Sequence, residues 1–412
     1  MEYGLIGEKL GHSFSKEIHE KVAGYKYDLV ELKKEELPEF LRVRNFKAIN
    51  VTIPYKEAVI PYLDEIDETA KEVGAVNTVV NKDGRLIGYN TDVDGFIYQL
   101  EHMSLNVKNK KVLVLGTGGA SKAIYAALKR LEAKEIIFVS SSHKPNSISY
   151  EEIDNYLDAS IIINCTPIGM YPHNEDNLLI NIDKFKHIDG IIDLIYNPIR
   201  TRLITSAQFR GIKAEGGLYM LVGQAYKAMN IFNGFTYKKE DVDKTHRELL
   251  NKKTNIVIIG MPSSGKTSIS KELSSRLNIP YIDIDDNIVK EINMPIAKLF
   301  ELEGEKSFRK LETKHVAQIY KTTQKIISTG GGIIKNKENI DMLKQNGTIY
   351  YINRSLNKLT PTSDRPLSSD KNKLEKLYNE RKPLYLMYAD KVIDNNQSVS
   401  DTVNAIIKER EL

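Results

Sequence analysis

Residues 255–267 read NIVIIGMPSSGKT and decide the fold of the second half of the chain. A strand-like apolar run leads into a glycine-rich turn, and Ile269, Leu273 and Leu277 then recur at helical spacing. The turn matches G-x-x-x-x-G-K-[ST], in which backbone N–H groups surround phosphates, the lysine adds positive charge and the hydroxyl binds magnesium. We therefore predict a phosphate-binding loop between a strand and a helix. Its expected nucleotide contacts are Gly260, Ser263, Ser264, Gly265, Lys266 and Thr267.

Polar residues follow the later strand-like runs of the same half. Asp283 and Asp285 end the run PYIDID, and Gly330-Gly331-Gly332 follow KIIST. Arg309 lies between them in SFRKLE. Because the carboxyl ends of parallel strands meet at one edge of a sheet, we expect these groups to converge beside the phosphate loop.

The first half contains a second glycine-rich turn, in KVLVLGTGGASKAIYAAL. It lies between a strand-like run and a helical one, which is the context of a Rossmann-type dinucleotide site. Ser121 occupies the position of the third glycine. The predicted cofactor contacts at this turn are Gly116, Gly118, Gly119, Ala120 and Ser121.

The next strand-like run, EIIFVSSSHK, indicates which dinucleotide binds. An enzyme specific for NAD would carry an acidic residue here for the ribose hydroxyl, and this run has none. Hydroxyl donors and a cation suit a 2′-phosphate dianion, which a carboxylate would repel. We therefore predict NADP as the cofactor, with Ser141, Ser142 and Lys144 near its 2′-phosphate.

The chain as a whole has the composition of a folded α/β protein. Its 412 residues exceed one compact core, and 59 basic against 55 acidic residues leave no bulk charge that would demand nucleic acid or an anionic membrane as partner. We find neither a targeting segment nor an apolar run of membrane-spanning length. Cys165 is the only cysteine, so an intrachain disulfide is impossible and a reducing, cytoplasmic location is expected. A polar stretch places the main domain junction near Lys252, either as a linker or as the last helix of the first domain.

Six motifs of the second half occur in the order found in shikimate kinases, and residues 254–412 resemble that family. They are the phosphate loop, D-x-D, F-R-x-x-E, the triple glycine, R-P-L and R-x-P-L-Y. The resemblance implies a parallel-sheet P-loop domain that binds ATP, Mg²⁺ and shikimate. Lys266 and Arg365 would stabilise the transferred phosphate, Thr267 and Asp283 would lie at the metal, and Asp285 would be the candidate base at a shikimate hydroxyl. The implied substrate contacts are Asp285, Arg309, Gly330, Gly331, Gly332 and Arg381.

Seven motifs of the first half resemble shikimate dehydrogenases across roughly residues 3–250: HSFSKEIH, INVTIPYKE, GAVNT, YNTDVDG, NCTPIGM, DLIYNP and GGLYMLVGQA. The resemblance implies an α/β substrate domain at 1–98, completed by about 218–250, and a Rossmann-type NADP domain at 99–217. Lys56 and Asp92 would form the catalytic pair. The implied contacts to substrate are Ser13, Ser15, Asn50, Thr52, Asn77, Tyr196 and Gln224.

Together the two resemblances imply a bifunctional enzyme that reduces 3-dehydroshikimate to shikimate and phosphorylates shikimate to shikimate 3-phosphate. Two alternatives stay open at this point. In the first alternative, the first half is a non-catalytic binding module attached to a kinase, as the serines in EIIFVSSSHK suggest. In the second, it is a dehydrogenase for quinate or shikimate that uses NAD. The sequence does not indicate the oligomeric state.

Overall fold

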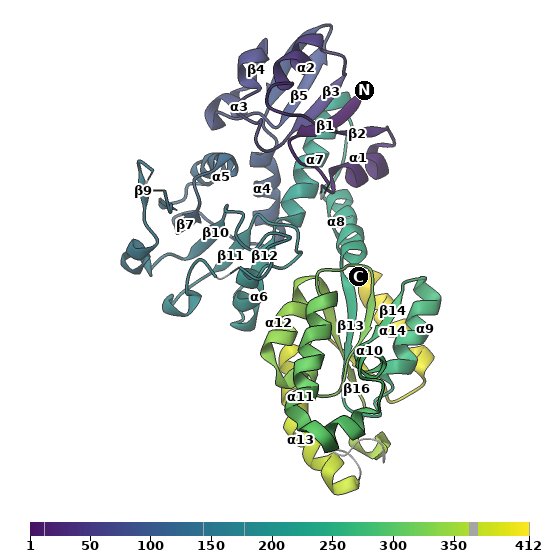
Figure 1. Cartoon of the computed structure of the whole chain (residues 1–412). Coiled ribbons are helices and arrows are strands. Elements are labelled where there is room, and N and C mark those ends of the chain that lie inside the picture. The colour runs from purple at the N-terminus through teal and green to yellow at the C-terminus, as the bar shows by residue number, and fades with distance from the viewer. Residues whose placement is uncertain (12, 143, 177, 362–369, 412) are drawn as a thin grey trace. The chain divides into compact units, whose positions relative to one another are not determined.

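The structure is a computed structural model that describes residues 1–11, 13–142, 144–176, 178–361 and 370–411. The chain forms two compact units, Met1–Glu248 and Leu249–Leu412, and the division falls within helix α8 (Lys239–Lys253). Figure 1 shows the elements of both units. Within the described ranges, no helix is both long and apolar enough to cross a lipid bilayer.

The N-terminal part of the first unit is built on a mixed sheet with the strand order β2-β1-β3-β5-β6-β4. β1 pairs in parallel with β2 and β3, whereas β5 runs antiparallel to both β3 and β6. The β5–β6 hairpin closes through Asp83 and Gly84, whose positive φ angles of 51° and 86° suit a two-residue turn. The elements are β1 (Tyr3–Gly7), α1 (Ser15–Ala23), β2 (Tyr27–Glu31), α2 (Leu37–Val43), β3 (Ala48–Val51), β4 (Glu65–Ile66), α3 (Glu68–Val73), β5 (Thr78–Lys82) and β6 (Arg85–Tyr89).

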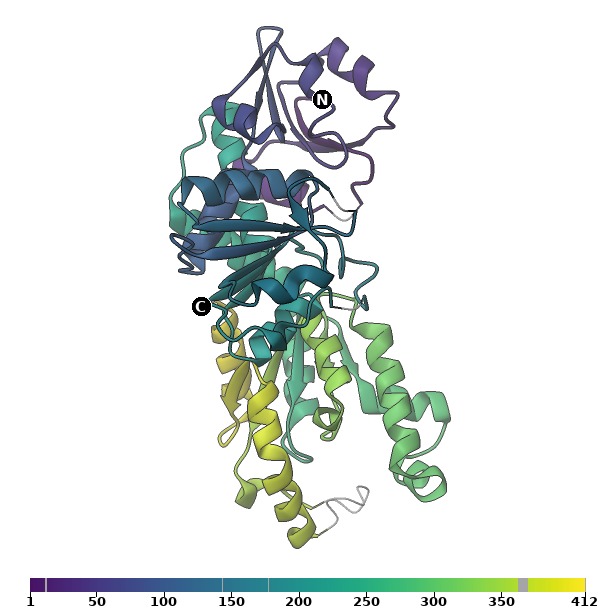
Figure 2. The same cartoon turned by 90° about the vertical axis from the view of Figure 1, so that its left-hand side faces the viewer.

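The rest of the first unit is a parallel six-stranded sheet in the order β12-β11-β10-β7-β8-β9, joined to the first sheet by α4 (Asp92–His102) and α7 (Leu218–Asn233). Alternate residues of β7 enter opposite cores, so the sheet is covered on both faces, by α4 and α5 on one and by α6 on the other (Figures 1 and 2). Its elements are β7 (Lys111–Leu115), α5 (Gly119–Arg130), β8 (Glu135–Val139), β9 (Ser147–Ile148), β10 (Ile161–Asn164), β11 (Gly190–Asp193), α6 (Arg202–Phe209) and β12 (Ala214–Gly216).

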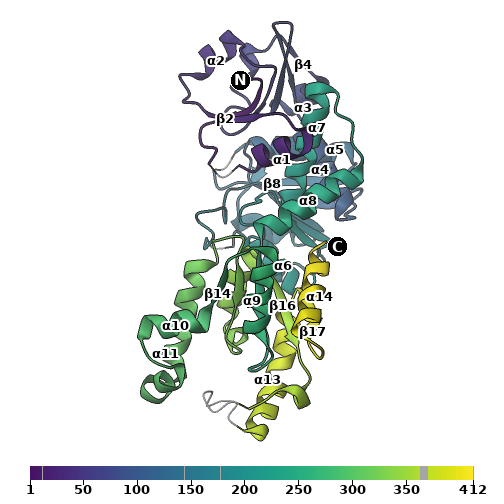
Figure 3. The ribbon, with the colours of Figure 1, turned by 90° about the vertical axis from the view of Figure 1, so that its right-hand side faces the viewer.

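The second unit contains a parallel sheet in the order β14-β15-β13-β16-β17. Helices α9 and α14 cover one face of this sheet (Figure 3), and their apolar residues pack together there. On the other face, the ring of Tyr351 in β16 stacks on Tyr385 of α13 with centroids 4.9 Å apart. The elements are β13 (Asn255–Ile259), α9 (Lys266–Leu277), β14 (Tyr281–Asp283), α10 (Ile284–Ile292), α11 (Ile296–Ile319), β15 (Ile326–Ser328), α12 (Lys337–Gln345), β16 (Gly347–Asn353), α13 (Lys371–Tyr388), β17 (Lys391–Asp394) and α14 (Val399–Glu411).

The architecture confirms the predicted fold class. The first unit joins an α/β domain to a Rossmann-type parallel sheet, and the second has a parallel sheet with the phosphate loop after its central strand β13. The antiparallel pairing of β3, β5 and β6 was not predicted, because strand direction depends on pairing partners distant in sequence.

Candidate functional site

Lys56 and Asp92 form an ion pair in the first unit. Nζ of Lys56, in the loop after β3, lies 2.6 Å from Oδ2 of Asp92, the first residue of α4. The side chains retain only 19% and 9% exposure, so solvent screens the pair less than it would on an open surface. The start of a helix also favours a carboxylate, because the N-terminal N–H groups carry partial positive charge. The pair thus holds a proton-donating ammonium group beside a fixed negative charge.

Asn77 fixes the other oxygen of this carboxylate. Its Nδ2 donates a hydrogen bond of 2.9 Å to Oδ1 of Asp92, and its Oδ1 accepts one of 2.8 Å from the backbone N–H of Thr91. The Thr91 hydroxyl in turn donates to Oε1 of Gln224, on α7, at 3.3 Å. Asn77 and Gln224, two of the expected substrate contacts, therefore belong to the same buried network as the ion pair.

Asn50 joins this network from β3. Its Nδ2 donates to the Thr78 hydroxyl at 3.0 Å, and that hydroxyl donates to Oδ1 of Asn77 at 3.0 Å. Oδ1 of Asn50 accepts a bond of 2.7 Å from the Tyr27 phenol. The side-chain amide is thus oriented from both ends.

Ser13, Ser15 and Tyr196 form a second group. The backbone N–H of Ser15, at the start of α1, donates to Oγ of Ser13 at 3.2 Å. Phe14 lies between the two serines in the sequence, and the centroid of its ring is 5.1 Å from that of Tyr196, which follows β11. Burial raises the pKa of the Tyr196 phenol, so that hydroxyl remains a hydrogen-bond donor at neutral pH. Thr52 directly follows β3, half-buried, in the loop that leads to Lys56.

The dinucleotide turn lies between β7 and α5. Gly116 has a φ of 96°, Gly118 precedes the helix in an extended conformation, and α5 begins at Gly119. Ala120 is in the first turn of α5, so its N–H belongs to the set that a helix leaves free for a phosphate. Ser121 is buried and its hydroxyl donates to the carbonyl of Gly118 at 2.7 Å, so its side chain serves the turn itself.

Hydroxyl groups gather at the end of β8, next to this turn. Oγ of Ser140 lies 3.1 Å from Oγ of Ser142 and 3.4 Å from Oγ1 of Thr117. Nζ of Lys144 reaches the carbonyl of Thr117 at 3.5 Å, while the side chain of Ser141 is exposed. Three hydroxyls and one cation suit a phosphate dianion, and no acidic residue takes part in these contacts. The donor set therefore fits the 2′-phosphate of NADP.

The phosphate loop of the second unit connects β13 to α9. Ser263 and Gly265 have positive φ angles of 62° and 90°, which turn the loop back over the start of the helix. Lys266 is buried, and its ammonium donates to the carbonyls of Gly260 and Met261 at 3.0 and 2.9 Å. The loop thus fixes the lysine where a terminal phosphate would bind.

Thr267 and Asp283 bring two oxygen ligands together beside this loop. The Thr267 hydroxyl donates to Oδ2 of Asp283 at 3.2 Å, and Oδ1 of Asp283 caps α10. A hydroxyl and a carboxylate are hard oxygen ligands of the kind that Mg²⁺ prefers, so the donor set fits this ion. Both residues line a cavity of about 270 Å³. Its other walls are Ser263, Gly265, Lys266, Ser268, Asp285, Asp286, Ser328 and Thr329.

The triple glycine is in close contact with charged side chains. Oδ1 of Asp285 lies 2.6 Å from the position that a Cβ of Gly330 would occupy. A side chain at Gly332 would collide with the guanidinium group of Arg309. That group is held by Glu305 at 2.9 Å and by Glu312 at 2.9 Å. Glycines are required here because charged groups approach the backbone so closely.

Arg381 is the most strongly desolvated cation of this region, with 2% exposure. Its Nη1 donates to the carbonyl of Gly331 at 2.8 Å. Among the described residues, Nε and Nη2 of Arg381 and Oε1 of Glu312 are buried without a hydrogen-bond partner. Burial raises the pKa of Glu312 to about 7. Two buried donors on a cation are costly unless a ligand satisfies them, and a carboxylate with further hydroxyls has the matching chemistry.

Arg365, expected as a lid arginine, lies outside the described residues.

Several polar residues that orient these sites were not among the predicted site residues. Thr78, Thr91 and Glu312 lie inside the motifs GAVNT, YNTDVDG and F-R-x-x-E, so the motifs themselves contained the signal. Tyr27 and Asn395 had no such signal. Asn395, after β17, donates to the carbonyl of Ser264 at 2.6 Å and thereby fixes the phosphate loop.

Comparison with known proteins identifies both regions. Residues 5–79 match the family of the shikimate dehydrogenase substrate binding domain, and residues 262–411 match the shikimate kinase family. A shikimate dehydrogenase (NADP(+)) of Clostridium perfringens is 40% identical over 265 residues, which cover 60% of this chain and 97% of that protein. One from Methanosphaera stadtmanae is 38% identical over 267 residues, covering 58% and 94%.

Solved structures give the same result for the first unit. A chorismate mutase/shikimate 5-dehydrogenase fusion protein from Clostridium acetobutylicum is 39% identical with a TM-score of 0.56, covering 60% of this chain and 96% of that one. Shikimate 5-dehydrogenase from Thermus thermophilus, in complex with NADP(H) and shikimate, is 27% identical with a TM-score of 0.54, covering 60% and 99%. The chain therefore belongs to the shikimate dehydrogenase family and carries a shikimate kinase domain behind it, which makes it a bifunctional shikimate-pathway enzyme that uses NADP and ATP.

Proposed function

We propose that the first unit reduces 3-dehydroshikimate to shikimate with NADPH and that the second unit transfers the terminal phosphate of ATP to the 3-hydroxyl of shikimate. The observation that carries the first activity is the Lys56–Asp92 ion pair at 2.6 Å, supported on both sides by the Asn77 network. A site that had lost its chemistry would have no need to keep this pair assembled.

In the reduction, NADPH supplies a hydride to the carbonyl carbon when it is bound. Lys56 then gives its proton to the developing alkoxide oxygen, and Asp92 keeps the ammonium group in place and balances its charge. The ring substituents are hydrogen-bonded by the network around Asn77, and Ser13 and Ser15 hold the substrate carboxylate. The further ring contacts in this proposal are Asn50, Thr52, Tyr196 and Gln224.

The turn before α5 would hold NADP, because the free N–H groups at a helix N-terminus favour a phosphate group. The proposed contacts are Gly116, Gly118, Gly119, Ala120 and Ser121 at the turn, with Ser141, Ser142 and Lys144 at the 2′-phosphate. The hydroxyl cluster with Lys144 next to Thr117 supports NADP over NAD.

In phosphoryl transfer, the 3-oxygen of shikimate bonds to the terminal phosphorus of ATP while the bond from that phosphorus to the bridging oxygen breaks. Asp285 accepts the hydroxyl proton, and Lys266 stabilises the transferred charge. Thr267 and Asp283 would hold Mg²⁺, which would supply positive charge to the phosphate oxygens. Arg309 and Arg381 bind the shikimate carboxylate beside Gly330, Gly331 and Gly332. Arg365 keeps its predicted role at the phosphates.

We also propose the domain boundaries 1–98 with about 218–250, 99–217, and 254–412. A reducing compartment such as the cytoplasm remains our expectation, since Cys165 has no second cysteine with which to pair.

Two variants of the full chain test both activities. The chain is mixed with 3-dehydroshikimate and NADPH, and the loss of reduced-nicotinamide absorbance is followed; ATP and Mg²⁺ are then added and shikimate 3-phosphate is assayed. Lys56→Met should lower the reduction rate by about 10²- to 10⁴-fold, the usual contribution of a general acid, and leave phosphorylation of added shikimate unchanged. Lys266→Met should do the reverse, so each variant is the control for the other.

The same assay separates the alternatives. Phosphorylation of shikimate without any oxidation of NADPH or NADH would show that the first unit is a binding module. Faster turnover of quinate with NAD than of shikimate with NADP would assign it to quinate oxidation. A quinate dehydrogenase from Corynebacterium glutamicum in complex with NAD is 27% identical, with a TM-score of 0.52, so this comparison of substrates and cofactors is needed.

A further inference from the structure

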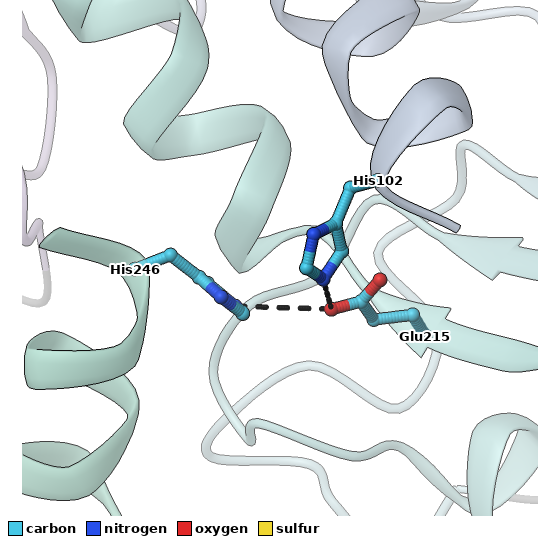
Figure 4. Close-up of side chains that lie close together, drawn as sticks. All are labelled: His102, Glu215 and His246. Carbon is cyan, nitrogen blue, oxygen red and sulfur yellow. Dashed lines mark ion pairs between the residues drawn. The ribbon is translucent and has the colours of Figure 1, made fainter. Parts of the chain in front are cut away.

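A group of metal-ligating side chains lies in the first unit, apart from the dehydrogenase site. Figure 4 shows His102, Glu215 and His246 pointing toward one another from the end of α4, from β12 and from α8. Oε1 of Glu215 lies 3.6 Å from Nε2 of His102 and 3.8 Å from Nε2 of His246. One ligand atom from each residue lies within 4.8 Å of the other two.

The three residues are poorly explained as ordinary packing. Glu215 is partly buried, with 26% of its side chain exposed, and within the described residues its carboxylate has no lysine or arginine partner and accepts no hydrogen bond. A buried carboxylate is costly unless a cation or several donors compensate it. The side chain of His246 is only 10% exposed, and its Nε2 faces the same carboxylate oxygen as Nε2 of His102.

The surroundings of His102 are those of an oriented metal ligand. Its other ring nitrogen, Nδ1, lies 3.6 Å from Oδ1 of Asp243. That oxygen also accepts a 2.6 Å hydrogen bond from the Tyr219 phenol, whose ring stacks on His102 at 4.0 Å. A carboxylate behind the second nitrogen of a histidine fixes the tautomer and aims the first nitrogen at the metal.

We propose that His102, Glu215 and His246 bind one Zn²⁺ ion in a structural site. Ligand atoms at about 2.0–2.1 Å from tetrahedral zinc lie roughly 3.4 Å apart. The distances of 3.6 and 3.8 Å from Glu215 therefore need to contract by a few tenths of an ångström, and the two imidazole nitrogens, which lie within 4.8 Å of each other, need to approach by at most about 1.4 Å. Two imidazoles and one carboxylate favour zinc over Mg²⁺ or Ca²⁺, which prefer all-oxygen sites. The side chain of His102 is 34% exposed, which leaves room for water as the fourth ligand.

The ion would join the helices that carry the dehydrogenase site. α4 begins at the catalytic candidate Asp92 and ends at His102, about 15 Å further along the helix at 1.5 Å per residue. Glu215 leads directly into α7, which carries Gln224, and His246 belongs to α8. Zinc therefore stabilises the fold of the first unit from a distance and takes no part in hydride transfer.

The test uses the full chain, stripped of metal with a chelator and kept free of Mg²⁺ and ATP. Zinc affinity is measured by competition with a chromophoric chelator, and Co²⁺ is added separately to record the visible bands of a tetrahedral nitrogen–oxygen site. We expect one tight zinc site per chain and a rise of roughly 5 °C in the unfolding midpoint of the first unit at saturating zinc. His246→Gln and Glu215→Gln should each weaken zinc binding by more than about 100-fold and remove the thermal shift.

Asp243→Asn tests the orienting carboxylate and should weaken zinc binding by about 10- to 100-fold. His187→Gln replaces an exposed histidine outside the proposed site and is the matched control, so it should change neither the zinc affinity nor the thermal shift. Retained NADPH-dependent reduction in each metal-free variant shows that the variant is folded. The proposal is overturned if the stripped chain takes up no zinc, or if the parent chain and His246→Gln bind zinc with the same stoichiometry and affinity.

Discussion

Arg381→Met separates a ligand-binding role of this arginine from a structural one, because the two roles predict different changes in stability. The substitution removes the 2.8 Å bond to the Gly331 carbonyl, worth about 1.5–3 kcal/mol for a charged donor. It also removes two buried donors, Nε and Nη2, that have no partner among the described residues, and each such donor costs about 1–3 kcal/mol. The two donors together cost about 2–6 kcal/mol, which offsets most or all of the lost bond, so Arg381→Met should lower the free energy of unfolding by no more than about 1 kcal/mol.

Shikimate binding should respond very differently to the same change. Truncating one partner of a buried charge pair costs about 2–5 kcal/mol, and a loss of about 3 kcal/mol corresponds to a roughly 150-fold weaker Kd. The assays are isothermal titration of the second unit's site with shikimate in the full chain and urea unfolding. Dehydrogenase turnover in the same chain is the internal control for folding. Lys376→Met, an exposed charge removal on the same helix, is the matched variant and should leave the shikimate Kd within twofold.

An unchanged Kd together with a stability loss above about 3 kcal/mol would refute this reasoning. That result would mean that Arg381 supports the fold through the Gly331 carbonyl and does not hold the substrate.

Three further predictions concern the other groups described above. Lys144→Gln should raise the KM for NADPH by about tenfold, from the loss of one charge-assisted contact, and leave the KM for NADH unchanged; equal changes in both would place the 2′-phosphate elsewhere. Asn395→Ala should raise the KM for ATP by about tenfold through loss of the bond to the Ser264 carbonyl, while the shikimate Kd stays the same; unchanged ATP kinetics would show that the loop holds its shape without this bond. Burial raises the pKa of Asp193 to about 7 from an ordinary value of 3.8, so this carboxyl stabilises the fold below pH 4 and that stability is lost as the pH rises toward 7. Asparagine does not titrate, so the unfolding free energy of Asp193→Asn minus that of the parent should rise by a few kcal/mol between pH 4 and pH 7 in urea unfolding. A difference that does not change with pH would contradict the raised pKa of Asp193.

The sequence predicted those parts of the molecule that depend on local backbone geometry. The phosphate loop and the dinucleotide turn each combine a strand, glycines and a helix within a short segment, so GMPSSGKT and GTGGAS could be assigned from their residues alone. The proposed catalytic pair Lys56–Asp92 required the family resemblance, because nothing in the spacing of two residues so far apart predicts a 2.6 Å contact. The His102 cluster was not anticipated, since its three ligands come from separate elements and match no short metal-binding pattern.

The two sites differ in how their polar groups are satisfied when no ligand is bound. In the dehydrogenase site, both carboxylate oxygens of Asp92 already have donors, from Lys56 and from Asn77. Such a network keeps one geometry, which suits a reaction where a proton donor must stand at a fixed position. In the kinase site, Arg381 and Glu312 keep buried polar atoms without partners among the described residues. Those atoms make the empty site less stable, and a ligand carboxylate and hydroxyl that satisfy them recover that free energy as affinity. Shikimate binding should therefore stabilise the second unit more than the first. In thermal unfolding without nucleotides, added shikimate should raise the unfolding midpoint of the second unit more than that of the first unit.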